Sequence, residues 1–221
     1  MIATDPAIEP LITAIAQADS PATLIGAVRA LAQTASLSAI PTLIEVLGYN
    51  NPGAASVAVA GLVQMGEAAV PLLLEQIDDY NYGARASSLR ALAAIADPRA
   101  FEVLLEAAAT DFAPSVRRAA IKGLGTLRWQ PRDLDGQPSI HDRTVSTLLL
   151  VSHDSDWTIR YAAIAAFQSW IFTLQNCSET TDLTRQALER LEHLRQTDED
   201  EVVRARASMA QHQLTIVPYA Q

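Results

Sequence analysis

The sequence is poor in the residues that staple or stiffen many small proteins. It contains one cysteine, Cys177, so an internal disulfide framework is excluded, and a lone thiol fits a reducing compartment. Aromatic residues make up only 5% of the chain. Its β-branched residues come singly inside helical patterns rather than in alternating runs, so strands are not expected. The apolar residues are mainly Ala and Leu, which favours an all-α protein.

Positive charge is also scarce. The chain has 16 Lys and Arg against 25 Asp and Glu, a net charge of −9. This balance argues against a general nucleic-acid binder, because phosphate neutralisation needs clustered basic residues, and leaves local basic patches open. The N-terminus lacks a basic segment followed by an apolar one, and no run of about 18 apolar residues occurs, so neither secretion nor membrane spanning is indicated. We expect a cytoplasmic protein.

Catalytic motifs are missing as well. The sequence has no Gly-rich phosphate loop, no HExxH and no GxSxG. Its histidines, His141, His153, His193 and His212, are scattered without the spacing of metal ligands. Cys177 lies in a polar stretch with no predicted base nearby, so we interpret it as an incidental thiol. We expect no metal site, no cofactor and no nucleophile from this chain.

What the sequence does contain is a repeat. Aligning one position in the second helix of successive helix pairs gives spacings of 31, 30, 32, 43 and 44 residues, as in an α-solenoid. Seven residues further on, an apolar side chain recurs on the same helix face in five pairs, as a buried stripe requires. The aligned positions are Leu24, Ala55, Arg85, Arg117, Arg160 and Arg204, and the stripe is Leu31, Leu62, Leu92, Leu124 and Phe167, with Gln211 in the sixth pair.

The predicted fold is an all-α solenoid of about six helix pairs in a single domain over residues 1–221. Turn signals and the spacing place the pairs at about 7–35, 39–65, 68–96, 97–129, 140–174 and 182–214. Prolines and a glycine predict an insertion loop at about 130–139, and a second interruption is predicted at about 175–181. The polar last helix is suited to be a terminal cap.

Aspartates recur in step with the aligned arginines. An aspartate in an interhelix turn and an arginine in the following helix can form a ladder of charged pairs between stacked repeats, while the aspartate accepts backbone N–H bonds near a helix start. We interpret the last three pairs as structural, and leave Arg85 open to both a structural and a functional role. The pairs, six residues apart, are Asp79 with Arg85, Asp111 with Arg117, Asp154 with Arg160, and Asp198 with Arg204.

The few aromatic residues gather at the turns inside the pairs, which align along one edge of a solenoid. Exposed aromatics interleaved with arginines are good material for binding. Tyr80 and Tyr82 therefore favour surface recognition, whereas for Phe112 and Trp157 packing against the neighbouring repeat is an equal alternative. Six of the twelve aromatic residues lie in or just after these turns: Tyr49, Tyr80, Tyr82, Phe112, Trp157 and Tyr161.

Several short segments resemble one family. Residues 80–86 (YNYGARA), 89–92 (LRAL) and 97–100 (DPRA) resemble the signature of the E/F-type phycobilin lyases. Residues 115–120 (SVRRAA), 127–129 (LRW) and 157–163 (WTIRYAA) are similar to the F-type subunits of that family. The resemblance covers about residues 40–215. It is specific, because generic HEAT repeats share the Asp and Arg ladder but not the tyrosine-rich turn.

The resemblance implies a HEAT-like α-solenoid that works as a heterodimer with a homologous E subunit. Such lyases attach phycocyanobilin through a thioether to a cysteine of the phycocyanin α subunit, so the nucleophile belongs to the substrate protein. A related subunit that also isomerises the bilin carries adjacent His and Cys residues. Cys177 has no neighbouring His, so attachment without isomerisation is expected.

Two other functions stay open from the sequence. The first is a non-enzymatic HEAT-repeat scaffold that binds phycobiliproteins during phycobilisome assembly or degradation, and the second is a generic HEAT adaptor. The lyase and the phycobilisome scaffold would both use a concave protein-binding surface. A homodimer is possible when the E subunit is absent, because an exposed apolar interface would pair with a second copy.

With the resemblance in hand, the tyrosine-rich turn is the predicted binding surface for bilin or partner. We expect Arg85 and Arg90 to pair with propionates, Tyr80 and Tyr82 to pack on pyrrole rings, and Asp79 to accept pyrrole N–H bonds. Phycocyanobilin is then a substrate rather than a cofactor. The predicted set is completed by Asn81, Trp157 and Tyr161.

Overall fold

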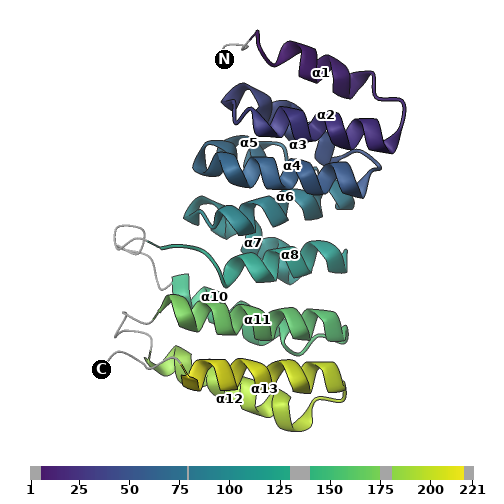
Figure 1. The fold of residues 1–221 in the computed structure, drawn as a ribbon. Coiled ribbons are helices and arrows are strands. Elements are labelled where there is room, and N and C mark those ends of the chain that lie inside the picture. Colours follow the sequence, from purple (N-terminus) through teal and green to yellow (C-terminus); the bar gives the residue numbers. More distant parts are fainter. Residues whose placement is uncertain (1–5, 79, 130–139, 175–180, 217–221) are drawn as a thin grey trace. The chain divides into compact units, whose positions relative to one another are not determined.

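The computed structural model describes residues 6–78, 80–129, 140–174 and 181–216. All regular secondary structure in these ranges is helical, which confirms the predicted all-α class. The chain forms two compact units, Met1–Ala100 and Phe101–Gln221. Within each unit the helices stack in successive pairs, the arrangement of a HEAT-like α-solenoid (Figure 1).

The helix starts of the first unit follow from local capping chemistry. Ser20 and Thr23 form a capping box at the start of α2, while the Asn51 and Asn81 side chains accept the first N–H groups of α4 and α6. Short 3₁₀ turns at Leu37–Ala39, Gly66–Ala69 and Pro98–Ala100 lead into the first helices of later pairs. The helices are α1 (Glu9–Ala16), α2 (Pro21–Gln33), α3 (Ile40–Leu47), α4 (Pro52–Met65), α5 (Val70–Glu75) and α6 (Tyr82–Ile95).

The second unit continues the same pattern. Its helices are α7 (Phe101–Thr110), α8 (Pro114–Leu124), α10 (Ile140–Val151), α11 (Trp157–Thr173), α12 (Thr181–Thr197) and α13 (Glu201–Ile216). The predicted helix pairs are confirmed to within a few residues, except that α8 ends at Leu124 rather than near 127–129. The predicted insertion at 130–139 lies outside the described residues, as does the interruption at 175–181 apart from Thr181, which begins α12.

The end of α8 lies close to α11. A Cβ atom on Gly125 would lie 2.5 Å from the carbonyl oxygen and 2.6 Å from the Cα of Ala166. The backbone at the end of α8 therefore approaches the backbone of α11 more closely than any side chain would allow. Glycine at this position is what lets the two helices pack.

The buried stripe is confirmed. All of its members are 0–1% exposed: Leu31, Leu62, Leu92, Leu124 and Phe167. They lie where α2, α4 and α6 pack in the first unit and where α8, α11 and α13 pack in the second. Full burial of such a side chain is worth about 1.5–3 kcal/mol, so the stripe is a principal stabilising feature. Gln211, at the equivalent position of the last pair, instead donates a hydrogen bond to Glu192.

One stretch of the first unit departs from the expectation that nothing resembles a membrane span. Residues Pro52–Glu75 are helical, long and apolar enough to cross a membrane by length and composition alone. Gly66, with a φ of 63°, interrupts this stretch and separates α4 from α5. Within the unit, α4 packs against α2, α3 and α6, so its apolar residues contribute to the core of the stack.

Candidate functional site

The charged ladder runs from one turn to the next in the second unit. Arg117 pairs with Asp154 at 2.7 Å. Arg160 holds Asp198 with two hydrogen bonds of 2.8 Å. Each arginine thus reaches the aspartate of the following turn rather than the one six residues before it. That geometry ties consecutive repeats together.

The preceding turn is bound through its backbone instead. Arg160 donates to the carbonyl oxygen of Asp154 at 2.9 Å, and Arg204 donates to that of Asp198 at 2.7 Å. The aspartate carboxylates also accept a backbone N–H two residues on, at 2.8 Å for Asp111 and 2.9 Å for Asp198. Arg160 and Asp198 therefore each shape a turn as well as a contact between repeats.

The first unit places Arg85 in a structural position. Its side chain is only 7% exposed and donates to the carbonyl oxygen of Asp78 at 2.8 Å. Asp79 lies outside the described residues. Asp78 caps the turn, accepting the N–H groups of Tyr80 and Asn81 at 2.8 and 2.7 Å, and these bonds lower the pKa of its carboxyl group. Burial leaves little guanidinium surface on Arg85 for a propionate, so its expected ligand contact stays a prediction.

The tyrosine-rich turn borders a groove of about 430 Å³ between residues 47–52 and the start of α6. Asn81 links the two sides of this groove. Its Nδ2 donates to the carbonyl oxygen of Gly48 at 3.1 Å, while its Oδ1 accepts the N–H groups of Gly83 and Ala84 at 3.0 and 3.1 Å. With every polar atom used in this way, Asn81 positions the turn.

Tyr82 and Arg90 line this groove, and Tyr80 precedes its lining residue Asn81 in the same turn. Tyr80 is 97% exposed and Tyr82 is 55% exposed. Arg90, eight residues or about two turns after Tyr82 on α6, is exposed and donates to the Ser87 hydroxyl at 2.7 Å. Two exposed rings and a guanidinium beside a shallow groove suit a flat, conjugated molecule that carries carboxylates.

The second unit has an aromatic surface of its own. Phe112 and Trp157 are among its exposed large apolar residues, so neither is buried against a neighbouring repeat. Beside Trp157, the guanidinium of Arg118 donates to Thr158 at 2.9 Å and joins α8 to α11. Tyr161 is half-buried. These residues are compatible with recognition, and the binding role of Trp157 and Tyr161 stays a prediction.

Histidines offer no metal chemistry in the part of the chain that the structure describes. No group of three or more His, Cys, Asp or Glu residues there is arranged to hold a metal ion. His141 is a core residue that accepts the Trp170 indole N–H at 3.3 Å, and burial lowers the pKa of its ring. His153 and His193 line a polar hollow of about 380 Å³ beside Arg190. Cys177 lies outside the described residues.

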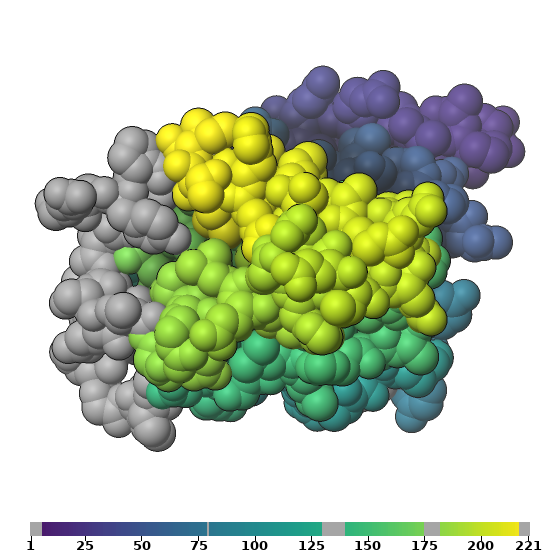
Figure 2. Space-filling view, turned by 90° about the horizontal axis from the view of Figure 1, so that it is seen from below, coloured from purple at the N-terminus to yellow at the C-terminus, as the bar shows by residue number. Residues whose placement is uncertain are grey.

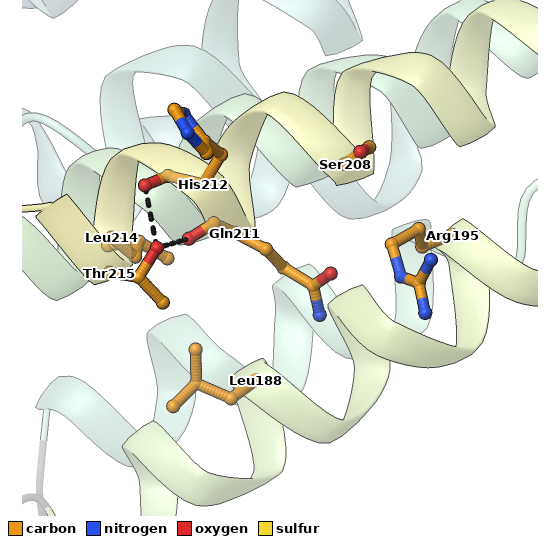
Figure 3. Close-up of a pocket in the computed structure, with 7 residues that line it drawn as sticks. All are labelled: Leu188, Arg195, Ser208, Gln211, His212, Leu214 and Thr215. Atoms are coloured by element: carbon orange, nitrogen blue, oxygen red, sulfur yellow. Dashed lines mark hydrogen bonds between the residues drawn. The ribbon is translucent and has the colours of Figure 1, made fainter.

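A further groove of about 470 Å³ lies between α12 and α13 at the end of the second unit (Figures 2 and 3). Its polar groups are largely occupied by one another. Thr215 donates to backbone carbonyls of α13, and Gln211 and Arg195 both bind Glu192. These bonds lower the pKa of Glu192 to about 2, chiefly through Arg195. Sequence reasoning did not single out this groove, because its residues come from two helices without a shared motif.

Comparison with known proteins identifies the family. The HEAT-repeat model matches residues 8–79, 50–125, 70–168 and 113–210. The "Phycocyanobilin lyase subunit beta" of Nostoc sp. is 52% identical over 92% of this chain and 98% of that protein. "Phycocyanin alpha phycocyanobilin lyase CpcF" of Synechocystis sp. is 56% identical over 74% of this chain and 77% of that protein.

A solved structure agrees with these relatives. One chain of the complex of CpcE and CpcF of the Nostoc phycocyanin lyase superposes with a TM-score of 0.70 and 53% identity, covering 80% of this chain and 99% of that one. The tyrosine-rich turn, the ladder and the paired helices thus occur in a chain that is similar to phycocyanobilin lyase subunits in both sequence and structure. This chain belongs to the phycocyanobilin lyase family of HEAT-repeat proteins, as an F-type subunit.

Proposed function

We propose that the chain is the F-type subunit of a heterodimeric bilin lyase that attaches phycocyanobilin to a cysteine of the phycocyanin α subunit in the cytoplasm of a cyanobacterial cell. The observation that carries this proposal is the groove lined by exposed Tyr82 and Arg90, with exposed Tyr80 in the same turn, in a member of this family. The names of the relatives support the reaction, and the solved complex of CpcE and CpcF supports an E-type partner.

In this reaction the chain itself forms no covalent bond. The cysteine thiol of the substrate protein adds across the ethylidene double bond of the bilin. Its sulfur bonds to the ethylidene carbon, and its proton ends on the tetrapyrrole, so no oxidant is needed. The lyase must hold the open-chain pigment in one conformation until the thiolate arrives. Such positioning can supply about 7–11 kcal/mol of the barrier in favourable cases.

The described residues divide this task. Tyr80 and Tyr82 offer faces on which pyrrole rings can pack, and Arg90 offers two N–H donors to a propionate. Asn81 keeps the turn of α6 against the turn of α4 through its bond to Gly48. Arg85 holds the same turn by donating to the carbonyl oxygen of Asp78. The exposed residues then contact the pigment while the buried ones position them.

A reconstitution experiment tests the proposal. The chain is co-expressed with its E-type partner, the phycocyanin α subunit and a source of phycocyanobilin, and covalent pigment on the α subunit is measured by fluorescence after denaturing electrophoresis. Pigment should appear only when both lyase subunits are present. Equal pigment without this chain would support the non-enzymatic scaffold instead, which the names of the relatives do not favour. An adduct with phycoviolobilin absorption would contradict attachment without isomerisation.

The oligomeric state belongs to the same proposal. With the E-type partner the chain forms a heterodimer, and without it an exposed apolar surface can pair two copies. Size in solution, measured by light scattering with and without the partner, distinguishes these states. A chain that stays monomeric alone at all concentrations contradicts the homodimer.

A further inference from the structure

Arg206, on α13, is a half-buried arginine of the second unit that has no ion pair within the described part of the chain. No carboxylate of the described residues lies within ion-pair distance of its guanidinium. Its Nη2 donates to Gln168 Oε1 at 2.7 Å, and its guanidinium lies 5.7 Å from the ring centre of Tyr161 on α11. Five other arginines of the unit each have a carboxylate at 2.8 Å or less: Arg117, Arg143, Arg160, Arg185 and Arg195.

One of the Arg206 nitrogens has no partner. Nη1 is buried from solvent and has no hydrogen-bond acceptor in the part of the chain that the structure describes. Burial lowers the pKa of Arg206, although contacts with Tyr161 oppose the shift. A charged donor that is withdrawn from water and left unsatisfied is costly, and such groups are rare in folded proteins. An anion that bound here would relieve both the charge and the missing bond.

Arg190 shows what a satisfied arginine of similar burial looks like. Its pKa is also lowered, again mainly by burial, with a nearby Asp198 acting in the opposite direction. Nε and Nη2 of Arg190 both bind Ser152, to the hydroxyl at 2.7 Å and to the carbonyl oxygen at 2.8 Å. Arg190 therefore has an internal carboxylate in its surroundings and two oxygen acceptors. Arg206 has one neutral acceptor and an aromatic ring.

The residues around Arg206 indicate which kind of ligand would bind its guanidinium. Val202 and Met209 lie four residues before and three residues after it, on the same face of α13, and both are about half exposed. The guanidinium lies over the Tyr161 ring. Tyr161 belongs to α11, which packs against α13 (Figure 1). An apolar surface with an aromatic ring and one uncompensated cation suits a conjugated molecule that ends in a carboxylate. A simple inorganic anion would leave the apolar residues unused.

We propose that Arg206 and Tyr161 form a second bilin contact, in which the Arg206 guanidinium binds a propionate carboxylate and the neighbouring apolar residues of α13 cover the tetrapyrrole. This inference rests on the proposed function. One hydrogen bond and one ring contact hold the guanidinium, so an arriving carboxylate draws it outward and accepts two N–H bonds from it. The site on α13 is separate from the groove between α12 and α13, whose residues lie on roughly the opposite face of that helix.

The test compares phycocyanobilin with its dimethyl ester, in which both propionates are neutral. Each is titrated into the heterodimer of this chain and its E-type partner, and Kd is measured by the change in pigment absorption. The wild-type complex should bind the free acid at least about tenfold more tightly than the ester, because a charge-assisted pair is lost. Arg206→Gln should weaken the free acid about tenfold and leave the ester unchanged, while the part of the ratio that Arg90 supplies should remain. Arg190→Gln is the matched control and should preserve the wild-type ratio.

Other results overturn the inference. If Arg206→Gln weakens acid and ester equally, Arg206 acts only through the fold, and thermal unfolding of the complex should then show the same loss. If the acid-to-ester ratio is unchanged while assembly with the E-type partner is weakened, the counter-ion is a protein carboxylate. If the wild-type complex binds no pigment, the site is absent. A complex that binds pigment with the expected ratios but attaches none to the α subunit contradicts the proposed function alone.

Discussion

Replacing Asp198 by alanine removes one half of the most buried ion pair of the second unit. The side chains of Asp198 and its partner Arg160 are 4% and 7% exposed, and two hydrogen bonds of 2.8 Å join them. Without Asp198, the Arg160 guanidinium keeps its bonds to the carbonyl oxygens of Asp154 and Ser155 but has lost its buried counter-ion. Breaking a buried pair in this way costs about 3–5 kcal/mol.

A second loss adds to the first. Asp198 also accepts the backbone N–H of Asp200, at 2.9 Å, in the turn before α13. Losing such a side-chain cap costs about 1 kcal/mol, so the free energy of unfolding should fall by about 4–6 kcal/mol in total. The surface pair of Arg143 and Glu102 provides the matched control, because Glu102 is 72% exposed. Glu102→Ala should cost less than about 1 kcal/mol.

Tryptophan fluorescence during urea unfolding measures the free energies of unfolding of these two variants in the second structural unit. All three tryptophans, Trp129, Trp157 and Trp170, belong to the second unit, and Trp170 is fully buried. Their emission therefore reports the unit that contains the mutated pair. A loss of under about 1 kcal/mol for Asp198→Ala, or one equal to that of Glu102→Ala, would refute the assignment of this pair as a buried structural contact.

Three further predictions follow from particular positions. Gly125→Ala should destabilise the second unit by about 1–3 kcal/mol or more, because the new methyl group meets the backbone of α11, whereas Gly26→Ala, with nothing within 4 Å of its new Cβ, should be neutral or stabilising; urea unfolding followed by circular dichroism distinguishes them. Tyr82→Ala and Arg90→Ala should each reduce pigment attachment at least about tenfold without changing the unfolding midpoint, and undiminished attachment would contradict a ligand role for the groove. Burial alone would raise the pKa of Asp198, but its bonds to Arg160 lower that pKa in the folded state. The stabilisation by Asp198 is therefore present above the unfolded Asp pKa of about 3.9 and is lost as pH falls below that value. Asp198→Asn should flatten the acid limb of the curve of unfolding free energy against pH, and an unchanged limb would contradict this.

The sequence by itself determined the helix pairs and the buried stripe. Both depend on short-range rules: turn and cap residues such as Ser20 and Asn51 start helices, and a period of 3.6 places Leu62 or Phe167 on the inner face of a helix. The exposure of Tyr80 and Tyr82 was also within reach, because tyrosines in a polar turn have no apolar stripe to join. Local patterns of this kind do not depend on how the neighbouring repeats are arranged.

Only the tertiary structure decided which side chains meet across the repeats. The sequence predicted a charged ladder between stacked repeats but not which aspartate each arginine meets. Stacking brings Arg160 to Asp198, 38 residues later, and buries Arg85 against its own turn. Arg206 could not be recognised from the chain, although one signal was present: no carboxylate lies three or four residues away from it. Whether such an arginine finds a counter-ion elsewhere depends on what the adjacent helix presents. On α11 it presents Tyr161 and Gln168, and neither carries a charge that could neutralise it.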